Sequence, residues 1–157
     1  MSEVPRDQKI TVFCLAAAAV FAADWLTKMV VTRAMTPDES IAIVPGVFHI
    51  TLIMNKGMAF GLLQGGQAVF IGIALLAIAV ILLHVFRSRS VDALGQLSLG
   101  LILGGTFGNL LDRIRLGYVV DFLDLRVWPV FNLADSSITI GAFLLAYKLL
   151  FNKPDRP

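Results

Sequence analysis

Residues 100–113 read Gly-Leu-Ile-Leu-Gly-Gly-Thr-Phe-Gly-Asn-Leu-Leu-Asp-Arg, an apolar run that ends in polar and charged side chains. Gly100, Gly104 and Gly108 recur at four-residue spacing, so they share one face of a helix. Small residues at this spacing let two membrane helices approach closely. We therefore predict a transmembrane helix that packs its glycine face against a neighbour and carries its polar end at one membrane boundary.

The composition of the whole chain agrees with a membrane protein. Of its 157 residues, 57% are hydrophobic and only 15% are charged, whereas a soluble domain has about 25% charged residues. The net charge of +2 is small, and no basic run interleaved with aromatic residues indicates nucleic-acid binding. Cys14 is the only cysteine, which excludes an intrachain disulfide and a cysteine metal cluster.

Crossing a bilayer takes about 20 residues of apolar helix. Four stretches have this character, at about residues 10–31, 68–86, 94–111 and 130–151. We predict an all-α membrane protein with four transmembrane helices, folded as a single polytopic domain over residues 1–157. The first stretch could instead be a cleavable signal peptide, but its apolar character resumes after Asp24, which favours a retained helix.

Residues 40–63, between the first two predicted helices, have a different pattern. Ile41–Val44 and Val47–Met54 are rich in β-branched residues and flank a Pro45-Gly46 turn, which predicts two short strands. Because an open sheet edge cannot face lipid tails, we expect a small β-sheet on the membrane surface.

The orientation follows from lysines and arginines in short loops. With both termini inside, the cytoplasmic side carries seven of these residues and the other side carries six. The short connector with Arg87 and Arg89 is the clearest signal, and it favours cytoplasmic termini.

Charged residues lie where a membrane helix should have few, and each costs about 3 kcal/mol or more. Asp24 lies 14 residues beyond Ile10, about 21 Å along a helix, so it belongs to the outer part of the bilayer. Lys28 follows at i+4, on the same face. The spacing alone fits a self-paired helix end as well as it fits a functional site.

Further polar residues follow the glycine-rich run. Asn109 and Arg113 share a helix face at i,i+4. Asp112 could pair with Arg113, with Arg115 or with Lys28. A purely structural polar network is the alternative to a functional site here.

Two more carboxylates arrive at the same membrane face. Asp121 follows a short linker between apolar residues, and Asp135 lies where the fourth helix begins. Asn132, three residues before Asp135, is a plausible N-cap. Each acid alone is typical of a loop or of a first helical turn, but two of them in apolar surroundings favour catalysis.

Five segments in this order resemble one family, the lipoprotein signal peptidases, also called signal peptidase II. They are Asp24–Lys28, Asn55–Phe60, Gly104–Arg113, Val120–Phe122 and Phe131–Ile138. The resemblance implies four helices with a periplasmic β-cradle, in the bacterial inner membrane, with both termini cytoplasmic and the active site facing the periplasm. It also implies an aspartic endopeptidase that cleaves the signal peptide of diacylglyceryl-modified prolipoproteins just before the lipidated cysteine. We expect no metal or other cofactor, prolipoproteins and membrane lipid as partners, no nucleic acid, and a monomer.

The family motifs also assign roles to single residues. They place the catalytic pair at Asp121 and Asp135, with Asp112 as the rival for one place. The residues expected to bind substrate are Asn55, Asn109, Arg113 and Asn132. Asp24, Lys28 and Asp112 are expected to support the site. The sequence departs from the family pattern in two places. In the cradle, Met58 stands where many members have a smaller residue, and the loop between the two aspartates is short, with only 13 residues.

Two close carboxylates can hydrolyse a peptide because they share one proton, so that one activates water and the other polarises the carbonyl. A small proton- or cation-coupled transporter is the alternative function. The acids cluster at one face, however, and neither an inverted repeat nor a broken helix is visible. A scaffold protein would explain the glycines but would leave the acids without a purpose.

Overall fold

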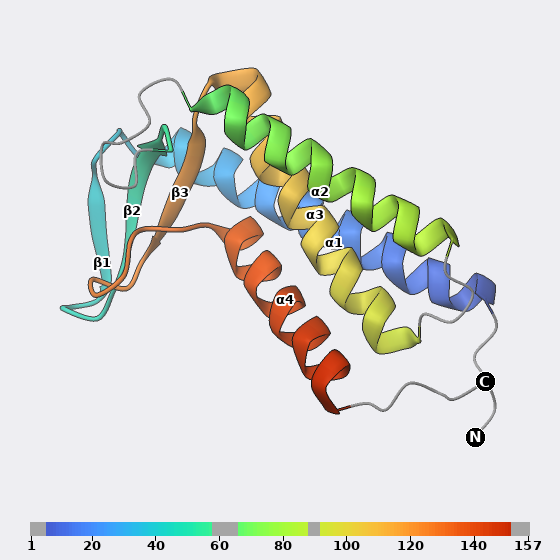
Figure 1. The fold of residues 1–157 in the computed structure, drawn as a ribbon. Coiled ribbons are helices and arrows are strands. Elements are labelled where there is room, and N and C mark those ends of the chain that lie inside the picture. Colours follow the sequence, from blue (N-terminus) through green and yellow to red (C-terminus); the bar gives the residue numbers. More distant parts are fainter. Residues whose placement is uncertain (1–5, 58–65, 88–91, 152–157) are drawn as a thin grey trace.

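The computed structural model describes residues 6–57, 66–87 and 92–151. In chain order the elements are α1 (Arg6–Ala34), β1 (Ser40–Val44), β2 (Phe48–Asn55), α2 (Gln67–Arg87), α3 (Ala93–Leu116), β3 (Val119–Asp124) and α4 (Leu133–Phe151). All four helices are long and apolar enough to cross a membrane. The three strands form a small sheet at one end of the helix bundle (Figure 1). The predicted fold class is therefore confirmed.

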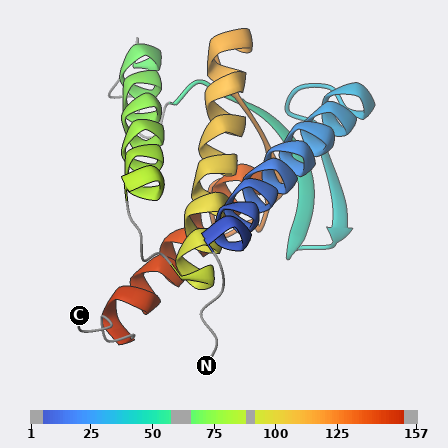
Figure 2. The same ribbon diagram turned by 90° about the vertical axis from the view of Figure 1, so that its right-hand side faces the viewer.

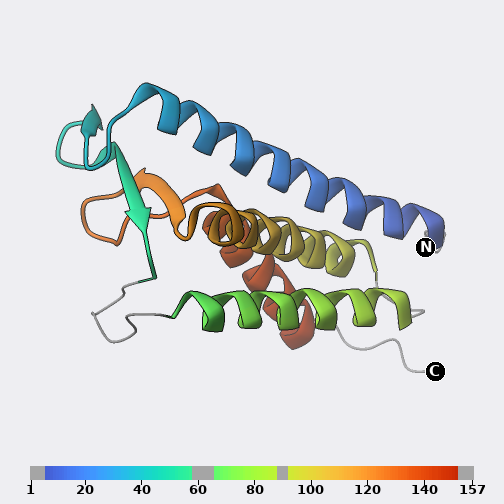
Figure 3. The ribbon, with the colours of Figure 1, turned by 90° about the horizontal axis from the view of Figure 1, so that it is seen from above.

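Helix α3 is the centre of the bundle and the most buried of the four helices. Figure 3 shows α1 and α2 on opposite sides of α3. The glycine face of α3 packs against α1, where Gly100 and Gly104 approach the carbonyl oxygens of Phe13 and Ala17. The predicted helix-packing role of these glycines is confirmed.

Replacing Gly104 by alanine should destabilise the protein by about 1–3 kcal/mol, the usual cost of overpacking. The added Cβ would lie 2.5 Å from the Ala17 carbonyl oxygen, so the α1 backbone would have to move. Gly72→Ala on α2 is the matched control, because its Cβ would meet nothing within 4 Å. Unfolding midpoints in detergent compare the two variants, and equal midpoints would contradict a close contact between α1 and α3.

The sheet is antiparallel in the order β1-β2-β3. The predicted hairpin is present, with the Val47 N–H donating to the Val44 carbonyl at 3.0 Å. Gly46 has a φ of 74°, a conformation that glycine adopts without steric cost. The third strand was not predicted: Asp121 was placed after a short linker, with no strand assigned there, whereas the structure has β3 at Val119–Asp124. Most of this strand is buried, so its sequence does not show the polar–apolar alternation that reveals a half-exposed strand.

Several helix boundaries also differ from the prediction, and α1 is longer than the predicted residues 10–31 at both ends. Helix α3 continues past residue 111 to Leu116, and it stops at Gly117, whose φ is 78° and whose N–H donates to the Arg113 carbonyl. Helix α4 begins at Leu133 rather than at residue 130. The Asn132 side chain accepts a hydrogen bond from the Asp135 N–H at 2.8 Å, which confirms the predicted N-cap.

Candidate active site

Asp121 lies on β3 and is only 1% exposed. Its two carboxylate oxygens accept hydrogen bonds from two asparagine side chains. Asn55, at the end of β2, donates to Oδ2 at 2.8 Å, and Asn132 donates to Oδ1 at 2.6 Å. Pairing of β2 with β3 sets this position, since Ile53 is the register partner of Asp121.

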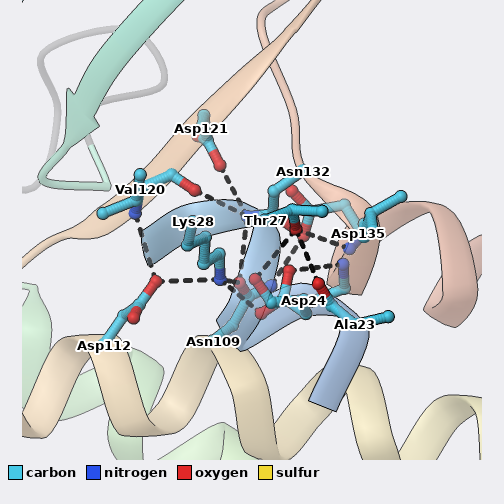
Figure 4. Close-up of polar contacts among 12 residues, drawn as sticks. Ala23, Asp24, Thr27, Lys28, Asn109, Asp112, Val120, Asp121, Asn132 and Asp135 are labelled. Carbon is cyan, nitrogen blue, oxygen red and sulfur yellow. Dashed lines mark hydrogen bonds and ion pairs between the residues drawn. The ribbon is translucent and has the colours of Figure 1, made fainter. Parts of the chain in front are cut away.

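Asp135 lies in the first turn of α4. Its Oδ1 accepts a hydrogen bond from the Asn109 side chain of α3 at 2.7 Å. The Oδ1 of Asn109 accepts in turn from Nδ2 of Asn132 at 3.0 Å. Asn132 and Asn109 therefore link the carboxylates of Asp121 and Asp135 through side-chain hydrogen bonds (Figure 4).

The electrostatic environment keeps a proton on Asp121 at higher pH than on a free carboxyl group. Burial raises the pKa of Asp121 to about 6, the hydrogen bond from Asn55 opposes the increase, and the negative charge of Asp135 adds to it. Like charges close together resist ionising at the same time. The geometry therefore suits a pair of carboxyl groups that shares one proton.

Lys28 lies at the centre of a buried ionic cluster beside the carboxylate pair, and it is 5% exposed. Its Nζ lies 2.7 Å from Asp24 Oδ2 and 2.8 Å from Asp112 Oδ2, and it donates to Asn109 Oδ1 at 3.1 Å. Asp24 and Lys28 do pair with one another, as their spacing allowed. Of the three partners considered for Asp112, the structure selects Lys28.

Both carboxylates that pair with Lys28 also accept hydrogen bonds from backbone N–H groups. Asp24 Oδ1 accepts from the N–H of Ala134 at 2.9 Å, and Asp112 Oδ2 accepts from the N–H of Val120 at 3.2 Å. Ala134 immediately precedes Asp135, and Val120 immediately precedes Asp121. Lys28 is thus connected to the backbone next to each member of the pair.

Arg113, expected to bind substrate, forms no ion pair with either aspartate in the part of the chain that the structure describes. Its Nη1 donates to the Asn109 carbonyl at 3.2 Å, and its guanidinium lies 5.2 Å from the centroid of the Phe70 ring on α2. Sequence reasoning did not single out Phe70, because an aromatic residue in an apolar helix carries no signal of its own. Met58, the departure noted in the cradle, lies outside the described residues.

The partners of the carboxylates are mainly amides, backbone N–H groups and Lys28. Within the described ranges, no three histidine, cysteine or acidic side chains are placed to hold a metal ion. The structure brings the predicted residues Asn55, Asn109 and Asn132 into direct contact with one or both aspartates.

The family model described as signal peptidase (SPase) II matches residues 16–151. The chain belongs to the signal peptidase II family. It is 51% identical over 122 residues to the lipoprotein signal peptidase of Halothermothrix orenii, covering 78% of this chain and 83% of that protein. It is 48% identical over 139 residues to the lipoprotein signal peptidase of Moorella thermoacetica, covering 88% and 92%.

Solved structures agree with this family assignment. A bacterial membrane enzyme determined by the in meso method at 1.9 Å resolution superposes with a TM-score of 0.83 and 31% identity, covering 90% of this chain and 94% of that one. A second such structure, at 2.3 Å resolution, gives a TM-score of 0.82. The resemblance seen in the sequence is confirmed, the chain is a multi-pass membrane protease, and these matches give no support to a transporter.

Proposed function

We propose that this signal peptidase II cleaves the signal peptide of diacylglyceryl-modified prolipoproteins just before the lipidated cysteine. The shared name of the relatives, which align over most of the chain, supports this activity. The position of the carboxylate pair supports it too, because Asp135 begins a membrane-length helix. The lipid of such a substrate can stay in the bilayer while the peptide reaches the pair.

We further propose an aspartic mechanism with Asp121 and Asp135 as the catalytic pair. One observation carries this proposal: two carboxylates from different elements are joined through Asn132 and Asn109. The charged member takes a proton from water, while the neutral member polarises the scissile carbonyl and later returns a proton to the amine. Because the titration belongs to the pair, neither role is assigned to one aspartate alone.

Asn55, Asn109, Asn132 and Arg113 are proposed to position the substrate backbone. Positioning of this kind supplies a large part of the rate enhancement of many enzymes. Arg113 is suited to it because Phe70 orients the guanidinium plane while leaving its other N–H groups for a ligand. Asp24, Lys28 and Asp112 would then keep the catalytic pair in place.

The proposed orientation puts both termini in the cytoplasm and the catalytic pair at the periplasmic face of the inner membrane. Helix α1 starts, and α4 ends, at the end of the bundle away from the sheet (Figure 1). Arg87, the last residue of α2, and Arg89 in the sequence that follows favour the same orientation. We expect the enzyme to act as a monomer on its prolipoprotein substrates.

The pH dependence of cleavage tests the shared proton. The pair is active with one proton bound, and the pKa of Asp121, raised to about 6, gives the pH range in which the pair is expected to lose its shared proton. We therefore expect kcat/KM for a diacylglyceryl-modified peptide to fall as the pH rises through about 6, approaching a tenfold loss per pH unit. Carboxyl carbon NMR should show a lower Asp121 pKa in Asp135→Asn, since a neighbouring negative charge is removed. An unchanged pKa would contradict the coupling of the two groups.

A further inference from the structure

A cavity lies beside the candidate active site, between the C-terminal ends of α1 and α3. Figure 2 shows these helices diverging toward the end of the bundle that carries the sheet. The cavity has a volume of about 270 Å³. Its lining includes Trp25, Lys28, Arg33, Asp112, Arg115 and Val120.

Two cationic groups in this lining are available to a ligand. Lys28 is already matched by Asp24 and Asp112 and is buried. Arg33 and Arg115 are exposed, and neither forms an ion pair with a carboxylate in the part of the chain that the structure describes. The cavity thus contains two guanidinium groups that have no ion-pair partner among the described residues. The positive charge of Lys28 in its inner wall is balanced by Asp24 and Asp112.

The surroundings of the cavity place it at the depth of lipid headgroups. Both α1 and α3 are membrane-length helices, and the cavity lies near their C-terminal ends. Trp25 in its lining is 44% exposed, and tryptophan is enriched at membrane–water interfaces. Arginine side chains at such ends extend toward the interface, where phosphate is the most abundant anion of the bilayer.

We propose that this cavity binds the phosphate of an anionic phospholipid, with Arg33 and Arg115 as its hydrogen-bond donors. Guanidinium groups bind phosphate through paired, charge-assisted hydrogen bonds. A zwitterionic headgroup is disfavoured, because its ammonium group would enter a cavity that already contains Lys28, Arg33 and Arg115. The inference concerns binding and does not depend on the proposed cleavage reaction.

Val120 connects the lipid cavity to the site. Successive side chains of a strand point to opposite faces, so Val120 lines the cavity while the neighbouring Asp121 faces the asparagines. A bound headgroup would therefore stabilise β3 from the face opposite the carboxylate pair.

Native mass spectrometry of the detergent-solubilised full chain, titrated with phosphatidylglycerol or phosphatidylcholine, tests the proposal. Wild type should bind one phosphatidylglycerol at least about tenfold more tightly than phosphatidylcholine. Arg33→Gln and Arg115→Gln should each weaken phosphatidylglycerol binding by about tenfold, the loss of one charge-assisted contact. The matched control is Arg126→Gln, an exposed arginine of the β3–α4 connection that pairs with Asp124 and should leave binding unchanged. Circular dichroism confirms that each variant is folded.

Three results would overturn the proposal. Equal affinity for the two lipids would show that the headgroup charge is not recognised. Unchanged affinity in both glutamine variants would show that the arginines do not bind the lipid. Their role would then be to stabilise the C-terminal ends of the helices, where cations offset the negative end of the helix dipole. A third arm adds inorganic phosphate to the phosphatidylglycerol titration, and displacement of the lipid by phosphate at the lipid's own concentration would make the ligand a soluble anion.

Discussion

Asparagine at either Asp121 or Asp135 is expected to lower cleavage of a diacylglyceryl-modified prolipoprotein by about 10³-fold or more. Each substitution removes a group that can be ionised, so the pair can no longer combine one charged and one neutral carboxyl. Residues that act as a unit lose most of their effect when one of them is removed. Turnover of purified protein in detergent with a defined lipopeptide provides the measurement.

Asp38→Asn is the matched control, because Asp38 is an exposed acid outside the site with a φ of 66°, and asparagine tolerates positive φ. It should cleave at the wild-type rate. Near-normal cleavage by either Asp121→Asn or Asp135→Asn would remove that residue from the catalytic pair. Asp112→Asn should cause a smaller loss, since Asp112 acts through Lys28 and the Val120 backbone. Complete loss in Asp112→Asn would instead favour Asp112 as a member of the pair.

Lys28→Met is expected to cause the largest loss of stability, about 3–5 kcal/mol, the usual cost of removing one partner of a buried ion pair. Asp24 and Asp112 would remain in the bundle without their shared cation. The two carboxylates would still accept hydrogen bonds from the Ala134 and Val120 N–H groups, but their negative charges would no longer be compensated by a cation. Chemical unfolding in detergent measures the change in free energy.

The comparison for Lys28→Met is Lys148→Met, which removes a lysine paired with a more exposed carboxylate, Asp92. Exposed pairs contribute about 0–1 kcal/mol, so Lys148→Met should have a small effect. Equal losses in the two variants would show that burial of the Lys28 cluster does not control stability. Asp24→Asn combined with Lys28→Met should recover part of the loss, because one of the two unpaired charges is then absent.

The four helices could be predicted because membrane spans depend on length and apolar content, which are local properties of the chain. The Asn132 cap and the pairing of Asp24 with Lys28 were predictable for the same reason, since each involves residues three or four positions apart. Strand β3 could not be predicted in this way. Its partner β2 lies far away in the sequence, and burial removes the alternation that would identify an exposed strand.

The same difference between local and long-range contacts applies to the candidate site. Family motifs indicated the aspartates and asparagines, but the residues alone left Asp112 with three possible partners. The choice of Lys28 depends on how α1 crosses α3, which the glycine contacts of α3 determine. The stacking of Arg113 on Phe70 depends on where α2 packs, and nothing near either residue in the sequence indicates it.

The order of biosynthesis gives the contacts of Asp24 a further consequence. Asp24 in α1 is synthesised well before α4, yet it accepts a hydrogen bond from Ala134 at the start of that helix. A partly translated chain therefore lacks both Asp135 and the anchor that aligns it. With the proposed catalytic pair, hydrolytic capacity would arise only after α4 has inserted, so a nascent chain without α4 is expected not to attack neighbouring membrane proteins.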